Sequence, residues 1–372
     1  MKNILLTLFV LAVITTVLLW VRYGGGAPYP DLSTTPMLNS SELEEVLAYD
    51  EPVGNVAVNR DGRLFFTIHP EARPTGNKLL EYVRGAAVPY PSGAAQAELF
   101  DTVLGLAIDR YNRLWTVDHG NHGLRSARIV AIDLDTNTVI REQVLAGDIA
   151  PAGSFLQDLQ VSADGRTVVI ADASFWRKSP AIIVYDVETG RARRVLEKHE
   201  SVSAEDYMIR NGDQKMTFLG GTVSLRGGID GIALGPKWLY YGAISGSGLY
   251  RVQLKDLRDA TLPAGQLANR VERVSDKPLS DGMSIDVDGT VYITAIEHGS
   301  IFVAGADREL KTLLQSHKLR WPDALSFGPD GYLYIADSAL SELILQPREH
   351  IDAQGPYRIF RFKPGAEGVP GQ

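Results

Sequence analysis

The 372-residue sequence contains no cysteine. Disulfide bonds, thiol catalysis, thiolate metal sites and a lipoprotein anchor are therefore excluded. An excess of positive charge is also missing, because the formal net charge at pH 7 is -8. The chain as a whole is not expected to bind nucleic acid. The sequence shows no serine nucleophile elbow, no glycine-rich nucleotide-binding loop and no zinc motif, so these enzyme classes are not indicated.

Turn-forming residues are abundant instead. The chain has 36 glycines and 19 prolines, and hydrophobic residues make up 45% of it. This composition favours a folded protein with many short strands over one with a few long helices. All-β architectures often hold a chain of this length in a single domain.

A long apolar run lies at the extreme N-terminus. It follows Lys2, extends from Ile4 to Trp20 with only threonines interrupting it, and precedes Arg22. The run is at the short end of the length that spans a bilayer, and no small-x-small cleavage site ends it. These features favour an uncleaved signal-anchor in residues 1–23 over a cleaved signal peptide or a buried core helix.

The location of the remaining chain follows from this segment. Residues 24–39 are predicted to be a flexible tether, because they begin with three consecutive glycines. The domain after them is expected in the periplasm or outside the cell, anchored to the inner membrane by residues 4–21.

One sequence pattern recurs six times in the rest of the chain. Each copy has a short apolar strand, a turn that usually carries Asp-Gly, and a second strand rich in Leu, Tyr, Val and Ile, which is a β-hairpin signature. A repeat of about 40–50 residues with four strands each is typical of β-propellers. We therefore predict an all-β, six-bladed propeller in residues 40–366, followed by a tail in residues 367–372. The copies begin at Gly54, Leu104, Gln157, Asp230, Asp281 and Asp323.

Two features of the repeat predict details of the propeller. The last copy lacks a fourth strand, and Leu43 to Tyr49 from the other end of the chain can supply it, which would remove an exposed edge. The third and fourth copies are separated by an insertion in residues 200–228. It is too long for an ordinary connection, so we expect a functional loop that covers one face.

The geometry of a propeller places certain polar residues together. The first strand of each blade lines the central channel, and the start of this strand shares a face with the end of the second strand. The first-strand position holds Gln157, Asp230, Asp281 and Asp323, which should converge in the channel. An aromatic wall is expected from Phe175 and Trp176. The ends of the second strands, expected around the same mouth, carry His69, Asp118, His119, Asp172, Glu297, His298 and Asp337.

A second interpretation of these residues is purely structural. An Asp at a strand entrance, above all one before Gly, often caps a turn through nearby backbone N–H groups. If three carboxylates do converge in a narrow channel, they repel, and either one pKa rises or a cation sits among them. That cation could be a metal ion, an ordered basic side chain or a ligand amine.

The order of several motifs resembles the yellow / major royal jelly protein family, over roughly Pro52 to Phe362. The resemblance implies a six-bladed propeller related at fold level to the senescence-marker/gluconolactonase family. It also implies the activities linked to insect members, which are dopachrome conversion, pigmentation and the binding of small amines. The motifs are RLWTVD from Arg113, FLQDL from Phe155, AIIVYD from Ala181, DGIAL from Asp230, LYY from Leu239 and WPD from Trp321.

The gluconolactonase relationship also implies a divalent-metal site, made by a Glu, two Asn and an Asp at channel positions. Here these positions hold Gly54, Leu104 or Gly105, Gln157 and Asp230. Gly and Leu side chains cannot ligate a hard cation, so a site of that design is incomplete. A site shifted toward Gln157, Asp230, Asp281 and Asp323, with Ca²⁺ as the candidate ion, stays open.

Three functions remain open on these observations. The first is binding, with tautomerase-like isomerisation as a further step, of a small aromatic or cationic molecule at the channel mouth. The second is metal-dependent hydrolysis of a lactone or ester, and the third is a non-enzymatic interaction platform. For the first two, Asp230, Asp281, Asp323 and His298 are the candidate catalytic residues, and Asp230 with Gln157 the candidate metal ligands. The candidate ligand-binding residues are Gln157, Asp118, His119, Asp172, Trp176 and Glu297.

Overall fold

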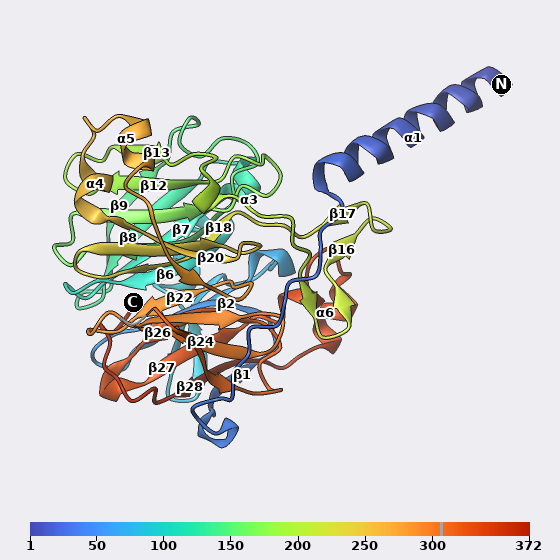
Figure 1. Ribbon diagram of the computed structural model, residues 1–372. Coiled ribbons are helices and arrows are strands. Elements are labelled where there is room, and N and C mark those ends of the chain that lie inside the picture. The colour runs from blue at the N-terminus through green and yellow to red at the C-terminus, as the bar shows by residue number, and fades with distance from the viewer. Residues whose placement is uncertain (306–307) are drawn as a thin grey trace.

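Six four-stranded antiparallel sheets surround a central channel in the computed structural model, which describes residues 1–305 and 308–372 (Figure 1). This confirms the predicted six-bladed propeller. The innermost strands are short apolar runs whose residues are almost all buried, as expected for sheets that are covered on both faces.

Each blade contributes its strands in chain order from the channel outward, except the last. The first three blades are β2 (Val53–Val58), β3 (Leu64–Ile68), β4 (Leu79–Val83) and β5 (Ala86–Pro89); β6 (Val103–Ile108), β7 (Arg113–Asp118), β8 (Arg128–Asp133) and β9 (Thr138–Val144); and β10 (Leu156–Val161), β11 (Thr167–Asp172), β12 (Ala181–Asp186) and β13 (Ala192–Val195). The next two are β18 (Ile229–Leu234), β19 (Trp238–Ala243), β20 (Gly248–Gln253) and β21 (Glu272–Asp276); and β22 (Met283–Ile285), β23 (Val291–Ala295), β24 (Ser300–Ala304) and β25 (Leu310–Gln315).

The sixth blade joins the two ends of the chain. It contains β26 (Pro322–Phe327), β27 (Leu333–Asp337) and β28 (Tyr357–Phe362), and its outer strand is β1 (Glu44–Tyr49), which pairs antiparallel with β28. The predicted closing strand is thus confirmed. The pairing covers the outer edge of β28 and ties residues near the N-terminus to the last blade.

Side chains between neighbouring blades form the core. Phe65 of the first blade, for example, packs in one cluster with Ile108 and Leu114 of the second. All three are at most 4% exposed. Burying a side chain of this size contributes about 1.5–3 kcal/mol, so each interface between blades holds its two sheets in place.

The insertion in residues 200–228 lies over one end of the channel. It contains η3 (Glu200–Val202) and two small hairpins, β14 (Arg210–Asn211) with β15 (Gln214–Lys215) and β16 (Thr217–Phe218) with β17 (Val223–Ser224). The remaining helices are α1 (Lys2–Tyr23), α2 (Gly93–Leu99), α3 (Gly120–Gly123), α4 (Leu254–Arg258), α5 (Ala264–Ala268), α6 (Arg348–Ala353), η1 (Ser40–Glu42), η2 (Pro70–Ala72), η4 (Pro329–Gly331) and η5 (Leu340–Glu342).

The α1 helix projects away from the propeller on the side that carries β16, β17 and α6 (Figure 1). It is long and apolar enough to cross a membrane by length and composition. The segment after it was predicted to be a flexible tether, but it lies along the propeller instead. Ala27 bonds to Asp206, and Met37 and Leu38 donate backbone hydrogen bonds to Thr312 and Leu313.

The C-terminal segment is also fastened rather than loose. Gly371 exchanges backbone hydrogen bonds with Ile108 and Phe327, and Gln372 Nε2 donates to the carbonyl of Val161. These partners lie at the far ends of the innermost strands of three blades. The predicted tail in residues 367–372 therefore occupies the end of the channel opposite the insertion.

Candidate functional site

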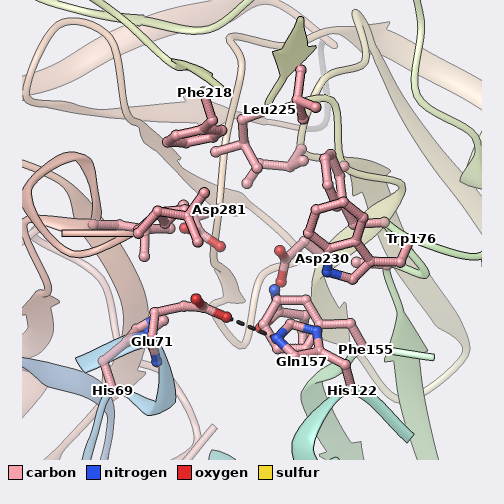
Figure 2. Close-up of a pocket in the computed structure, with 18 of the residues that line it drawn as sticks. His69, Glu71, His122, Phe155, Gln157, Trp176, Phe218, Leu225, Asp230 and Asp281 are labelled. Atoms are coloured by element: carbon pink, nitrogen blue, oxygen red, sulfur yellow. Dashed lines mark hydrogen bonds and ion pairs between the residues drawn. The ribbon is translucent and has the colours of Figure 1, made fainter. Parts of the chain in front are cut away.

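A cavity of ≈ 220 Å³ lies at the end of the channel beneath the insertion. Its floor contains Asp323 and three residues that Figure 2 labels, Asp230, Asp281 and Gln157. The sequence predicted that these four residues would converge. Gln157, Asp230 and Asp323 are each the second residue of an innermost strand, and Asp281 lies two residues before β22, so the four residues come from blades three to six. The repeat register therefore brings these side chains to one place.

A β-bulge near the start of the inner strand shapes this floor. In β10 the pairing with β11 shifts between Leu156 and Leu159, so Gln157 and Asp158 face a single residue of the partner strand. Such a bulge turns both side chains away from strict alternation. Asp158 is thereby within hydrogen-bond distance of the first blade, where Asn55 Nδ2 donates to Asp158 Oδ1 at 3.0 Å. The register of the repeat indicates only Gln157 in this blade, and so it does not identify Asp158.

Burial dominates the electrostatics of the floor. It raises the pKa of Asp281 to about 6, and together with the charge of Asp281 it raises the pKa of Asp158 to about 8. The pKa values of Asp230 and Asp323 lie well above the ordinary value, first through burial and then through the charge of Asp281. At neutral pH the cluster therefore holds protons, and Asp281 is its most readily ionised member.

Two buried groups stand behind the floor and were not singled out from the sequence. Trp321 Nε1 donates to Asp281 Oδ2 at 2.6 Å and orients that carboxyl. Lys277 is completely buried and donates to Ser280 Oγ and the carbonyl of Pro278, both at 2.9 Å. Burial lowers the pKa of Lys277 to about 7, while nearby carboxylates, Asp230 and Asp281 among them, act in the opposite direction. Lys277 is thus an ordered basic side chain of the kind that the convergent aspartates could require.

Two carboxylate oxygens of the floor have no protein partner. Asp230 Oδ2 and Asp323 Oδ2 are buried, and among the described residues neither has a hydrogen-bond partner. Buried acceptors are nearly always paired, and leaving one unpaired costs about 1–3 kcal/mol. When these two carboxyls are ionised, the oxygens therefore need a donor that the described residues do not supply.

One wall of the cavity carries two histidines and a glutamate. Glu71 Oε1 lies 2.9 Å from His122 Nε2, as the dashed line in Figure 2 shows. Although burial alone would raise the pKa of Glu71, this contact and the neighbouring charges hold it below its usual value. His69 Nδ1 accepts a hydrogen bond from the backbone of Glu71, and burial lowers its pKa to about 4. Neutral His69 therefore carries its proton on Nε2, which lies 3.8 Å from Asp323 Oδ2.

The other walls are apolar. Trp176 and Phe175 line the cavity as the predicted aromatic wall, and Phe155 packs against His122 with ring centroids 4.4 Å apart. The insertion adds Phe218 and Leu225 above the floor (Figure 2). The insertion was thus correctly predicted to cover this face. An acidic floor under aromatic and aliphatic walls suits a molecule with an apolar body and a basic group.

Several predicted site residues do not line this cavity. Asp118 is buried and accepts hydrogen bonds from the backbone of Asp101, Thr102 and Gly120. His119 is also buried and packs against Phe155 instead of facing the cavity. Both residues tie the segment before β6 to the loop that follows β7.

The corresponding residues of two other blades have the same structural task. Asp172 accepts from the backbone of Phe155 and pairs with Arg194 at 2.7 Å, and Asp337 accepts from the backbone of Trp321. A carboxylate at the end of the second strand therefore closes the loop before its own first strand. The backbone-capping role that was considered for aspartates at strand entrances is therefore observed at these strand-end aspartates.

Glu297 and His298 lie at a separate depression of the surface. Glu297 accepts a hydrogen bond from the backbone of Arg210, and burial raises its pKa to about 7. His298 Nε2 lies 3.4 Å from Asp31 Oδ1. Neither residue lines the cavity that contains the aspartates, so the predicted catalytic assignment of His298 finds no support from its position.

The donor set does not form a metal site in residues 1–305 and 308–372. No group of three or more His, Asp or Glu side chains is placed there to hold an ion. The channel positions of the first two blades hold Gly54 and Leu104, which have no oxygen ligands to offer. The residues present thus do not fit the divalent cation that the sequence left open.

The carboxyl groups can nevertheless support proton transfer. Asp281 is largely ionised at neutral pH and can accept a proton, whereas the neighbouring Asp230 holds one and can donate it. Such a pair can take a proton from one atom of a bound molecule and return one to another atom, as a tautomerisation requires.

The protein is thus a six-bladed propeller with a cavity of small-molecule size at one end of its channel. The sequence matches the family described as Major royal jelly protein over residues 101–346, and the chain belongs to this family. No curated protein matches the sequence significantly.

Solved structures with similar folds share little sequence with this chain. A luciferin-regenerating enzyme has a TM-score of 0.56 at 10% identity and covers 88% of this chain and 97% of its own. A calcium-binding regucalcin from Agrobacterium tumefaciens has a TM-score of 0.56 at 14% identity, with 91% and 98% covered. A gluconolactonase from Xanthomonas campestris has a TM-score of 0.53 at 15% identity, with 92% and 99% covered. At these identities the likeness shows the fold alone.

Proposed function

We propose that this protein binds a small molecule with an aromatic or other apolar body and a protonated amine, in the cavity between the aspartate floor and the apolar walls. The observation that carries this proposal is the pair of buried, unpartnered oxygens on Asp230 and Asp323. A protonated amine has several N–H donors and a positive charge, so it can satisfy both oxygens and stabilise their ionised forms.

The apolar walls support the same ligand class. Trp176, Phe155 and Phe218 line the cavity, and aromatic rings attract cations through their faces as well as packing against apolar groups. The chain belongs to the major royal jelly protein family, and its resemblance to insect members of this family implies small amines as ligands. This agrees with the chemistry of the cavity.

Binding of an aromatic amine should depend on the charge of Asp230. We expect 2-phenylethylamine to bind the detergent-solubilised full chain, and 2-phenylethanol, its neutral counterpart, to bind far more weakly. Asp230→Asn keeps the shape but cannot ionise when the amine binds, and should weaken amine binding at least about tenfold, since losing a charged partner costs about 1.5–3 kcal/mol. Isothermal titration calorimetry measures both affinities.

The matched control is Asp288→Asn. Asp288 lies exposed in the turn between β22 and β23, at the other end of the channel, so this variant should bind the amine like the wild type. Equal affinity of the wild type and Asp230→Asn, with unchanged circular dichroism spectra, would contradict the proposed site.

Lactone hydrolysis assisted by a divalent cation is the second candidate. It is favoured by the fold shared with a gluconolactonase, and by Asp230, which matches that family's metal-site Asp. The described donor set does not fit the ion, which is why we place amine binding first. Hydrolysis of gluconolactone that is stimulated by Ca²⁺ and abolished by chelator would reverse this order.

We also propose that α1 anchors the propeller to the outer face of the inner membrane. Its length of about 33 Å, at 1.5 Å per residue, matches a hydrocarbon core of about 30 Å. The full chain should therefore stay in the membrane pellet after alkaline carbonate extraction, and protease added to spheroplasts should digest the propeller. Recovery of the full chain in the soluble cytoplasmic fraction would contradict this location.

A further inference from the structure

Three large apolar side chains stand exposed at the rim of the cavity. Leu219, Leu345 and Trp176 all line the mouth, and they are 61%, 59% and 40% exposed. They come from three different connections: the insertion, the segment after η5 and the loop after β11. Exposed apolar side chains that gather from separate loops mark a surface that meets an apolar partner.

The backbone is strained at two of these positions. Leu219 has a φ of 51° and Leu345 a φ of 58°, in the left-handed region that favours glycine or asparagine. A turn facing only water gains nothing from a leucine in this conformation, because the residue is both strained and exposed. An apolar partner for the side chain would offset that cost.

The α1 helix ends on the same rim. The ring of Tyr23, the last residue of α1, lies 5.6 Å from that of Trp176 and 5.9 Å from that of Phe175. Its hydroxyl donates to the carbonyl of Trp176 at 2.8 Å. The next residue, Gly24, accepts a hydrogen bond from Arg226 of the insertion. The chain thus passes from α1 to the rim with no spacer between them.

Charged and aromatic residues at this junction are those found at a membrane surface. The Nζ of Lys178 lies 4.3 Å from the centroid of the Phe175 ring and 5.3 Å from that of Tyr23. Arg22 donates to the carbonyl of Arg177 at 3.1 Å. Aromatic and basic side chains are enriched where a spanning helix leaves the hydrocarbon, since they contact lipid headgroups there.

We infer that the cavity opens onto the membrane. Leu219, Leu345 and Trp176 lie in the headgroup layer of the outer leaflet that α1 crosses, and the cavity takes its ligand from that layer. The ligand is therefore an amphiphilic amine, whose apolar body lies along the walls while its amine reaches Asp230 and Asp323. This inference rests on the proposed amine site and on α1 remaining attached as a membrane span.

The absence of cysteine allows a direct test with single nitroxide labels. Full-length L219C and L345C are labelled in vesicles of phosphatidylcholine and phosphatidylglycerol. The accessibility of each label to oxygen and to a water-soluble nickel chelate is measured by electron paramagnetic resonance. The control is V287C, because Val287 is 61% exposed like Leu219 but lies in the turn between β22 and β23, at the other end of the channel. Both rim labels should be several-fold less accessible to the chelate than the control label, and more accessible to oxygen.

Rim labels that are as accessible to the chelate as the control label would overturn the inference, and this result would leave the Asp230→Asn comparison unaffected.

A second measurement tests the ligand class: 2-phenylethylamine and its 4-hexyl derivative are titrated into vesicles with and without the protein. The hexyl derivative should bind the protein several-fold more tightly after its partition into protein-free vesicles is subtracted. No gain from the hexyl chain would overturn the amphiphilic ligand.

Discussion

Replacing Asp158 with asparagine is expected to stabilise the ligand-free protein, by an amount that grows as the pH rises from about 4 to about 8. Burial and the charge of Asp281 raise the pKa of Asp158 from 3.8 to about 8 in the folded state. A carboxyl whose pKa is raised on folding does not lower the free energy of unfolding at a pH below its pKa in the unfolded chain. It costs stability progressively as the pH climbs toward its folded pKa. Asparagine has no such cost and can still accept the hydrogen bond from Asn55.

The measurement is the difference in free energy of unfolding between Asp158→Asn and the wild type, from chemical denaturation at several pH values. At pH 8 the gain should reach at least about 1 kcal/mol, since one pKa unit corresponds to about 1.4 kcal/mol. Using a difference removes the opposite contribution of His69, whose pKa is lowered. Asp288→Asn should show no such trend, and a variant less stable than the wild type at every pH would contradict the raised pKa.

Replacing Gly231 with alanine is expected to destabilise the protein and to disturb the floor of the cavity. A Cβ at this position would lie 2.2 Å from the backbone oxygen of Asp281 in the next blade. The clash is between β18 and the buried segment that leads into β22, and neither can move without disturbing the packing of its blade. We expect a loss of about 1–3 kcal/mol in the free energy of unfolding, together with weaker amine binding, because Asp281 must move.

Gly265→Ala is the matched control for this prediction. Gly265 lies in α5, and a Cβ at this position would have no heavy atom of another residue within 4 Å outside its own helix and its chain neighbours. Alanine there should therefore be neutral or raise stability by up to about 1 kcal/mol. Equal stability of Gly231→Ala and the wild type would show that the inner strands are less closely packed than their distances indicate.

The repeat made most of the fold predictable from the sequence. Six hairpin signatures, four of them with Asp-Gly turns, determined the number of blades, and an incomplete last copy pointed to the closing strand near the N-terminus. The register of the first strands also brought Asp230, Asp281 and Asp323 together, because the same position in successive blades meets at the same height of the channel. Local pattern and overall topology agree at these positions.

The remaining site residues depend on contacts that no repeat encodes. A bulge turns Asp158 into the channel, and Lys277 reaches the aspartates from an outer loop of the fourth blade. Glu71 and His122 meet across 51 positions of sequence in loops of two blades. Conversely, Asp118 and Asp172 carry the right residue type at the right face, but their oxygens are taken by local backbone N–H groups. A signal for Asp158 was present in the FLQDL motif, where two polar residues follow each other inside an apolar strand.

The seating of Gly371 and Gln372 at the far end of the channel has a kinetic consequence. With the C-terminal residues filling that end, the ligand that we propose would enter and leave through the mouth beneath the insertion, and a cavity of ≈ 220 Å³ would hold one such molecule at a time. An occupant must depart before its successor arrives, so the two can never pass each other. The residence time of the bound molecule would then set the upper limit on the rate at which one ligand replaces another. A slowly dissociating analogue would block the cavity for as long as it stays bound.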